Sequence, residues 1–486
     1  MNTNLSMKLR SILLVAVISF VCAVQALPQD LKYLVYDKDQ IPASVYKQRR
    51  ERLVKELGGD AAVFLFSASE KNRNGDGDYS YRQDDNFYYL TGFTEPNAVL
   101  ALSGKGILIP DYLDSTRSDT VHEILFVQPR DRRIEQWTGR RFGPEGAVQL
   151  IGVQAAMTND KFGRFFPMLV PDTANPHIFV ASLPEKNERD ADILMPLREA
   201  IGRMKLRTPP LEPSDPGPII RKYRMIKDSS EIALITRAAH ISAIAHRQAM
   251  MSCNPAMSEY ELQAVYEYVF RRMGSEFNAY PCIVGSAENS IVLHYESNRR
   301  NIADGDIVLA DCGAEYHYYA SDLTRTYPAN GKFSDAQRKV YQVVLNAQNE
   351  AIGLMKPGAV WRDISAAADS ILEDGLYGLG IIKSKERKDL RRFYPHGLGH
   401  AVGLDVHDVN SPTMEPGMIY TVEPGIYIPE NSEGVDPKFF NIGVRIEDDI
   451  LITAGGHSIL TAEAPREIEE IESLMQQKGI GDIPLK

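Results

Sequence analysis

Apolar positions recur with two different periods along the first 200 residues of the chain. Residues 44–58 combine apolar side chains at helical spacing with the polar run YKQRRER, which predicts a helix. Short apolar runs rich in aromatic and branched residues, which predict strands, occur at 60–68, 86–93, 98–102 and 123–129. Because helical and strand-like stretches continue to about Ala200, we expect an α/β domain of ordinary size in this part.

A proline-rich stretch, LRTPPLEPSDPGPIIRKYR, separates this part from the rest of the chain. Its five prolines resist helix and lack amide donors, which predicts an extended connection. Directly afterwards, Asp228 or Ser229 can cap a helix whose first turn includes Glu231. The sequence therefore predicts two domains, residues 27–218 and 219–486.

The second domain mixes the two periods. Helical spacing recurs at 258–273, 334–354 and 361–374. Strand patterns occur at 305–315, 319–327, 418–428 and 441–453. The fold class expected for the whole chain is therefore α/β, or α+β.

The first 26 residues have the features of a signal peptide. Lys8 and Arg10 form a positive flank, and the apolar run SILLVAVISFVCAV that follows is short for a membrane span. Small residues at 24 and 26 suit cleavage after Ala26. We expect export to a periplasm or to the outside, with an uncleaved anchor as the alternative. No later stretch is long and apolar enough to span a bilayer, so no membrane association is expected after removal of the signal.

Charge and cysteine content exclude several kinds of function. The formal net charge is −11 and the pI is near 5.5, and such a surface repels phosphate backbones, so nucleic-acid binding is not expected. Removal of the signal leaves Cys253, Cys282 and Cys312, without CxxC spacing. No zinc knuckle or disulfide framework is expected, although one pair remains open beside the alternative of buried free thiols.

The segment DGDIVLADCGAEYHYYASDLTRTYP contains the first candidate chemistry. A hairpin turning at Tyr316-His317 would place Asp311 directly opposite Asp322, with Cβ atoms about 5 Å apart. Two carboxylates at that distance repel each other unless a proton or a cation lies between them. The alternative is that one aspartate ends its strand in solvent. His317 would lie at the solvated tip of this hairpin.

Two glutamates add to this pair. Glu423 interrupts the apolar run IYTVEPGIYI, and Arg445 and Glu447 share one face of FNIGVRIEDDILIT by the period of two. A plain Arg–Glu ion pair on an edge strand would explain the latter two residues alone. Because a buried carboxylate is costly unless it is paired or metal-bound, the acidic residues together predict a shared cation site.

Three histidines lie in the run HGLGHAVGLDVHD, at positions 396, 400 and 407. Four carboxylates carry a charge of −4, which balances two divalent cations. A set of hard oxygens with one imidazole and no thiolate favours manganese, with zinc or cobalt possible. Spacing does not decide which histidine is the ligand, and the glycines between them predict a non-helical path.

These motifs resemble the pita-bread metallopeptidases, in the branch of Xaa-Pro aminopeptidases and prolidases. The matching stretches are VGSAENSIVLHY, LADCGAEYHYYASDLTRTYP, HGLGHAVGLDVHD, TVEPGIY and IGVRIEDD. In the first domain, RQDDNFYYLTGFTEPNAVL and EQWTGRR resemble the creatinase and aminopeptidase P type of N-terminal domain. The resemblance covers most of the mature chain and implies such a domain followed by a pita-bread catalytic domain.

The resemblance also assigns the metal ligands. Asp322 and Glu447 would bridge two divalent ions, and Glu423 would also take the proton from the bridging water. The five side chains that match the family's ligands are Asp311, Asp322, His400, Glu423 and Glu447.

Further residues match the family's substrate site. His294, His396 and His407 would bind the peptide and stabilise the tetrahedral intermediate. Arg445 would orient a bridging carboxylate, and Tyr427 would lie near the pocket. In addition, Trp137 resembles an aromatic residue that reaches a neighbouring subunit's site in some members, which implies a homo-oligomer, a dimer or a tetramer.

The implied activity is that of an Xaa-Pro aminopeptidase acting on peptides with proline in the second position. The nearest alternative is an Xaa-Pro dipeptidase, a prolidase. A metal-free creatinase-like hydrolase is disfavoured because all five ligand types are present, and methionine aminopeptidases lack this N-terminal domain. A non-enzymatic pita-bread binding module is the remote alternative.

Overall fold

The computed structural model describes residues 31, 34–110, 118–169, 177–181, 195, 198–199, 202 and 213–482. The predicted signal peptide, residues 1–26, and the first part of the proline-rich stretch lie outside the described residues. The chain divides into two compact units, Met1–Gly217 and Pro218–Lys486. Within the described ranges, no helix combines the length and the apolar character needed to cross a bilayer.

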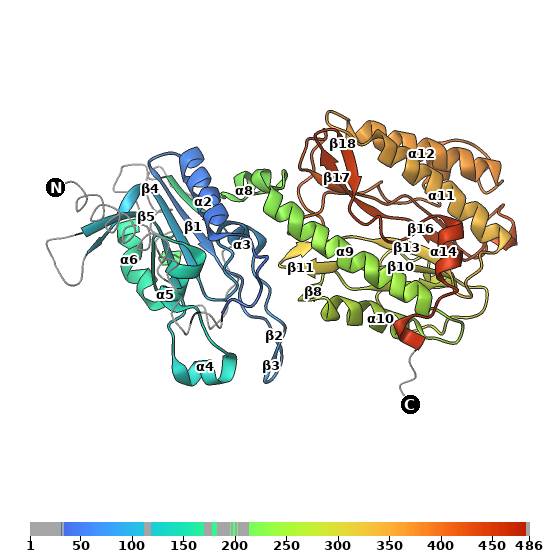
Figure 1. Ribbon diagram of the computed structural model, residues 1–486. Coiled ribbons are helices and arrows are strands. Elements are labelled where there is room, and N and C mark those ends of the chain that lie inside the picture. The colour runs from blue at the N-terminus through green and yellow to red at the C-terminus, as the bar shows by residue number, and fades with distance from the viewer. Residues whose placement is uncertain are drawn as a thin grey trace, which may run out of the picture. The chain divides into compact units, whose positions relative to one another are not determined.

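The first unit is built on a five-stranded mixed sheet (Figure 1). Its strands in chain order are β1 (Ala61–Phe66), β4 (Val99–Pro110), β5 (Ser118–Val127), β6 (Ala155–Thr158) and β7 (His177–Ala181). They lie in the order β6-β5-β4-β1-β7, with β4 antiparallel to both neighbours and β6 and β7 added in parallel at the edges. Phenylalanines of the sheet pack against those of the helix Phe162–Leu169, which buries one face of the sheet.

Helices and one small hairpin surround this sheet. The strands of the hairpin are β2 (Asn72–Asn74) and β3 (Gly77–Asp78). The α-helices are α2 (Ala43–Leu57), α3 (Asp85–Thr91), α4 (Arg132–Thr138), α5 (Gly143–Gly146) and α6 (Phe162–Leu169). A buried ion pair from Arg50 on α2 to Glu123 on β5, 2.6 Å, fastens the first helix to the sheet. The predicted helix at 44–58 is thus confirmed as α2.

The strand predicted at 86–93 is wrong, because this segment forms α3. Asp84 caps the helix by accepting a hydrogen bond from the Phe87 amide at 2.9 Å, and Gly92 ends it in the left-handed conformation with φ +64°. All residues from Phe87 to Thr91 are buried. A short helix that is buried on every side has no polar face, so its sequence has no helical period.

The second unit contains two helix pairs with strands between them (Figure 1). α9 packs on α10, and α11 packs on α12. Asp228 and Glu231 form the predicted capping box at the start of α9. The α-helices are α8 (Gly217–Arg224), α9 (Ser229–Ser252), α10 (Glu259–Arg272), α11 (Asp335–Leu354), α12 (Trp361–Gly378), α13 (Arg387–Leu390) and α14 (Ile468–Leu474).

Each of the four predicted strand regions of the second domain appears as two shorter strands, divided beside an acidic residue. The first two regions give β10 (Ile307–Asp311), β11 (Ala314–Tyr316), β12 (Tyr319–Ala320) and β13 (Thr324–Pro328). The last two give β14 (Ile419–Val422), β15 (Gly425–Ile428), β16 (Ile442–Arg445) and β17 (Asp448–Thr453). The remaining strands are β8 (Phe277–Asn278), β9 (Ile283–Ser286) and β18 (Gly456–Ile459).

The turn of the first hairpin differs from the predicted one by one residue. Tyr316 pairs with Tyr319, so the turn residues are His317 and Tyr318, whose φ values are +47° and +71°. Positive φ at both positions is the requirement of a type I′ turn, whose twist matches that of the flanking strands. In this register Asp311 pairs with Thr324 and not with Asp322.

The prediction that His317 is solvated at the tip of the hairpin is also wrong. Only 6% of the residue is exposed, and its Nδ1 lies 2.9 Å from Glu276. Cys253, Cys282 and Cys312 are all buried free thiols.

Candidate metal centre

The breaks in the strands bring the acidic side chains together. Asp311 is the last residue of β10, and Asp322 lies in the connection from β12 to β13. Although the two are not directly opposed, both carboxylates accept from the hydroxyl of Tyr280, each at 2.6 Å. A hydroxyl has a single hydrogen, so it cannot fully satisfy two ionised carboxylates at once. The pair therefore needs a further positive charge or proton.

The two glutamates lie opposite each other in an interrupted ladder. Val422 pairs with Asp448 on one side of the break, and Gly425 pairs with Arg445 on the other, so continuing either register places Glu423 opposite Glu447. The amide of Glu447 donates to the Thr324 carbonyl at 3.1 Å, which links this ladder to that of the aspartates. Strand register, and not local sequence, sets where these carboxylates lie.

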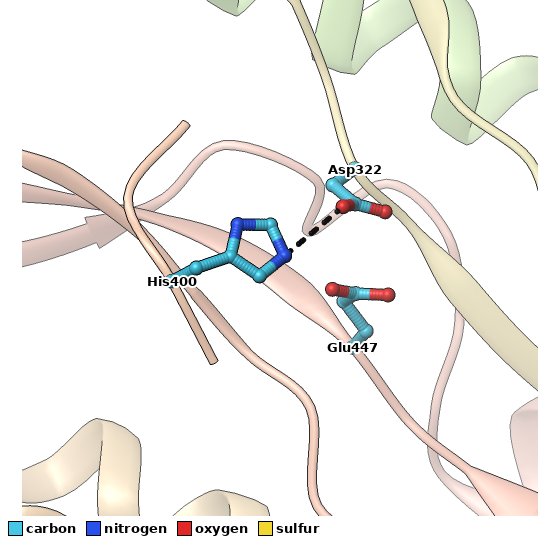
Figure 2. Close-up of side chains that lie close together, drawn as sticks. All are labelled: Asp322, His400 and Glu447. Carbon is cyan, nitrogen blue, oxygen red and sulfur yellow. Dashed lines mark ion pairs between the residues drawn. The ribbon is translucent and has the colours of Figure 1, made fainter. Parts of the chain in front are cut away.

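Glu447 has one satisfied and one unsatisfied oxygen. Its Oε2 accepts from Thr324 Oγ1 at 2.6 Å, whereas its Oε1 is buried without a hydrogen-bond partner among the described residues. An unpaired buried carboxylate oxygen is costly unless a cation or a proton contacts it. Its position beside Asp322 and His400 suits a cation (Figure 2).

His400 reaches these carboxylates from a loop that runs beside β14. Its amide donates to Thr421 Oγ1 at 3.0 Å, and Thr421 donates back to the His400 carbonyl at 2.8 Å. Gly399 is required for this approach, because its φ is +156° and a Cβ would lie 2.3 Å from the Thr421 carbonyl oxygen. The path is non-helical, as predicted from the glycines.

The ring of His400 presents one nitrogen to the acidic cluster. Nδ1 lies 3.2 Å from the Ala401 carbonyl, to which it can only donate, so the unprotonated nitrogen is Nε2. Nε2 lies 3.5 Å from Asp322 Oδ2 and 3.6 Å from Glu423 Oε1. Ligand atoms of Asp322, His400 and Glu447 all lie within 4.8 Å of one another (Figure 2).

Burial and mutual repulsion raise the pKa of three carboxyl groups of the cluster. Burial, reinforced by the charge of Asp311, raises the pKa of Asp322 to about 7. Burial raises the pKa of Glu423 to about 8, and burial with the charge of Asp322 raises that of Glu447 well above its ordinary value. The acids therefore bind either protons or cations, and their oxygens with one imidazole nitrogen fit divalent ions.

Arg445 is the buried counter-charge of the cluster. Its guanidinium contacts Asp311 Oδ2 at 2.6 Å, Tyr427 OH at 3.0 Å and Thr324 Oγ1 at 3.2 Å. Although burial lowers it, Tyr427 and the carboxylates hold the pKa of Arg445 well above its ordinary value. Arg445 thus fixes Asp311 directly and Glu447 through Thr324.

A hydrogen-bond chain from Arg445 fixes the tautomer of His396. Tyr427 OH accepts from the Arg445 guanidinium, so its own hydrogen is donated to His396 Nε2 at 2.8 Å. Nδ1 then carries the proton and donates to the Gly397 carbonyl at 2.8 Å. Burial and the charge of Arg445 lower the pKa of His396 to about 4, which keeps the ring neutral.

The cluster opens into a cavity of about 430 Å³. All five residues predicted as metal ligands line it, as do His294, His396, His407 and Arg445. The His407 ring stacks edge-on against His400, with centroids 4.0 Å apart, and burial together with His400 lowers its pKa. Tyr427 lies behind the cavity wall, 4% exposed, and acts on it through Arg445 and His396.

Trp137 belongs to the other compact unit. It lies on α4, a helix without buried residues, and is 90% exposed. The cavity is lined only by residues of Pro218–Lys486. The structure therefore assembles all the predicted site residues except Trp137 within one unit.

Sequence reasoning missed three residues of the site. Tyr280 bridges the two aspartates, and Thr324 joins Arg445 to Glu447. Asp449 accepts from Ser321 Oγ at 2.8 Å and from the Asp322 amide at 3.1 Å. Asp449 could have been found, because it too interrupts an apolar run, whereas Tyr280 and Thr324 follow ordinary strand composition.

Two family models match the chain in the order of its units. The model described as the aminopeptidase P N-terminal domain matches residues 46–179. The model of metallopeptidase family M24 matches residues 233–454.

The chain is similar to curated enzymes over nearly its full length. It is 39% identical to the Xaa-Pro aminopeptidase of Haemophilus influenzae over 449 residues, which cover 90% of this chain and 98% of the relative. It is 38% identical to the Xaa-Pro aminopeptidase of Escherichia coli, with the same coverage of both chains. The solved structure of E. coli aminopeptidase P with the inhibitor Pro-Leu superposes with a TM-score of 0.80 and 37% identity, covering 90% and 99% of the two chains.

Proposed function

Since the chain belongs to metallopeptidase family M24, we propose that it is an Xaa-Pro aminopeptidase, which hydrolyses the bond between an N-terminal residue and a penultimate proline. The two-domain fold predicted from the motifs, an aminopeptidase P type of N-terminal domain followed by a pita-bread domain, is confirmed. The proposed activity is the one for which the relatives are named, and the similarity to them covers 90% of this chain. The observation that supports it most directly is the buried carboxylate and imidazole cluster at the base of one cavity.

We propose that the cluster holds two divalent ions, with manganese favoured over zinc or cobalt. The ligands would be Asp311, Asp322, His400, Glu423 and Glu447, whose four negative charges balance two such ions. Two observations fit this assignment: the Oε1 of Glu447 has no hydrogen-bond partner among the described residues, and the pKa of Asp322 is raised. A cation would contact that oxygen and would lower the pKa of Asp322. When bound, divalent ions acidify a water molecule and polarise a peptide carbonyl.

Glu423 moves the proton in this proposal. Its carboxyl lies at the cavity, 3.8 Å from His396 and 3.6 Å from His400. The leaving proline nitrogen has no N–H and must gain a proton before it departs. A carboxylate that receives a proton during the attack and delivers it to that nitrogen completes the hydrolysis without a further group.

The three histidines divide into two kinds. Both ring nitrogens of His396 already have partners, so it orients the wall beside Glu423. In the described part of the chain, His294 and His407 line the same cavity without a hydrogen-bond partner for their rings. In this proposal, these two histidines hold the peptide and the oxyanion that forms during attack.

Comparison of two substrates tests the activity. Purified protein with added Mn²⁺ should hydrolyse an Xaa-Pro-Yaa tripeptide, as followed by release of the N-terminal residue. Cleavage of an Xaa-Pro dipeptide alone would favour the prolidase alternative. Failure to bind Mn²⁺ in metal analysis, with no turnover of either peptide, would favour the binding module.

We propose that the protein is exported and assembles with copies of itself. Residues 1–26 support export by their composition, and N-terminal sequencing of the mature protein beginning at Leu27 would agree with it. Trp137 and Ile134, exposed on α4 to 90% and 51%, support assembly. A monomer in light scattering would argue against assembly, and retention of the full-length chain in the cytosol would argue against export.

A further inference from the structure

His294 lies in a segment that has little regular structure to hold it. The chain leaves β9 at Ser286, makes a single 3-10 turn at Ala287–Asn289 and reaches β10 only at Ile307. No strand or helix includes His294, although its side chain lines the cavity. The position of this ring therefore depends on side-chain contacts made by the segment around it.

Glu259 makes several of those contacts. It is the first residue of α10 and is fully buried, at 0% exposed. Its Oε1 accepts from the amide and the hydroxyl of Ser286, each at 2.8 Å, and from Asn289 Nδ2 at 3.1 Å. One carboxylate oxygen thus holds the beginning of the segment.

The second oxygen holds the other side of His294. Oε2 accepts from the hydroxyl of Tyr295 at 2.9 Å and from the amide of Arg300 at 2.9 Å. Tyr295 is the direct neighbour of His294 in the chain. Because the donors lie both before and after His294, the carboxylate closes the segment into a loop of fixed shape. The N-terminal end of a helix favours a negative charge at this place.

We propose that Glu259 is the positioning residue for His294. It touches neither the cavity nor the predicted ligands, so it acts on the reaction only through the loop 286–300. This inference rests on the proposed function, in which His294 holds the peptide. Loss of hydrogen bonds to this carboxylate would let the His294 ring move, and a displacement of about 1 Å in a reacting group can reduce the rate roughly 100-fold.

The variant Glu259→Gln tests the proposal. Glutamine has the same shape, but its amide group would face the Arg300 amide, which can only donate. We expect kcat/KM for an Xaa-Pro-Yaa tripeptide to fall roughly 10- to 100-fold at saturating Mn²⁺. We expect Mn²⁺ binding, measured by calorimetry, to stay unchanged, since none of the ligands contacts Glu259.

A double-mutant cycle separates positioning from general damage. In a His294→Ala background, Glu259→Gln should have no further effect, because the group it positions is already gone. An equal fall of kcat/KM in both backgrounds, or no fall in either, would overturn the proposal. Absence of wild-type turnover would instead count against the proposed function, so the two failures are distinguishable.

Two further variants complete the design. Glu261→Gln removes the same charge from the same helical turn, where Glu261 caps the Ser258 amide at 2.7 Å, and should leave activity unchanged. Tyr295→Phe removes the hydroxyl that donates to Glu259 and accepts from the Arg299 amide at 3.3 Å. Because Tyr295 is partly exposed, this variant tests the proposal even if Glu259→Gln does not fold. We expect a smaller fall, about threefold, that again disappears in the His294→Ala background.

Discussion

The acidic residues and the histidines of the site are held in different ways. The carboxylates lie at breaks in antiparallel ladders, where backbone pairing on either side sets their positions. Unlike the predicted ligand His400, which is held by Thr421 of β14, His294 and His396 lie in irregular segments. Distant side chains hold them: Glu259 holds the segment of His294, and Tyr427 holds the His396 ring. The difference teaches that metal affinity and substrate positioning depend on different supporting residues, with Arg445 as the residue that contacts both parts. Substitutions can therefore change one and spare the other.

The largest effect is expected from Glu423→Gln, which changes one of the carboxylates at the breaks in the ladders. The variant keeps the shape of the side chain but removes the group that would accept the proton. We expect kcat to fall roughly 10³-fold, within the range that proton transfer contributes. Circular dichroism should show an unchanged fold, and Glu430→Gln, an exposed acid nearby, should retain activity. Retained turnover in Glu423→Gln would show that another group moves the proton.

Thr324→Val also changes the part of the site that holds the carboxylates, and it tests whether the Thr324 hydroxyl positions Glu447. The change removes the hydroxyl that donates to Glu447 at 2.6 Å and accepts from Arg445. Loss of such an outer partner lowers metal affinity roughly 10- to 100-fold. Calorimetric titration with Mn²⁺ measures this loss, and Thr324→Ser, which keeps the hydroxyl, should restore the affinity. An unchanged affinity would mean that Arg445 alone orients the cluster.

Arg391→Lys is the corresponding change in the part of the site that holds the histidines. Arg391 donates to the carbonyls of Tyr394 and His396 at 3.1 and 2.8 Å and pairs with Asp369 on α12 at 2.7 Å. Lysine keeps the charge but cannot make this fork of contacts. We expect kcat/KM to fall about tenfold, with no change in Mn²⁺ affinity.

Arg392→Lys is the matched control for this substitution. The Arg392 side chain is exposed, donates to the Glu433 carbonyl at 3.4 Å and lies over the Phe393 ring. A fall in Mn²⁺ affinity for Arg391→Lys, and not for Arg392→Lys, would contradict the separation of the two parts.

The smallest effect is a pH-dependent stability of the metal-free protein. The pKa of Asp322 is raised to about 7 and that of Glu423 to about 8, so the folded state holds protons that the unfolded chain releases near pH 4. The free energy of unfolding should therefore fall as the pH rises from about 4 to about 8. Bound Mn²⁺ replaces those protons. Its stabilising effect on Tm should be roughly 5 °C larger at pH 8 than at pH 5. Calorimetry with and without chelator measures this, and an equal effect at both pH values would refute it.

The sequence could predict that the carboxylates lie close together, because each one breaks an apolar pattern. Asp311, Glu423 and Glu447 are conspicuous in strands that are otherwise apolar, and burial makes such exceptions costly. The apolar pattern could not predict the exact register of the hairpin, since the turn at His317-Tyr318 uses residues that rarely adopt positive φ. A shift of one turn residue moved the partner of Asp311 to Thr324.

The supports of the histidines could not be predicted in the same way. Glu259 lies 35 positions before His294 and at a helix start, where an acidic residue needs no special explanation. In the first unit, the burial of α3 on all sides removed the period that identifies a helix. Contacts that depend on three-dimensional closure leave no periodic trace in the chain.

The interruption at Glu423-Pro424 has a consequence for how ions enter and leave. Pro424 has no amide hydrogen to donate, so the pairing of β14 with β17 cannot continue into that of β15 with β16, whether or not the cluster holds cations. The backbone of the predicted ion-binding site is thus formed before the ions bind. One metal should be exchangeable for another by simple dialysis under native conditions, without an unfolding step.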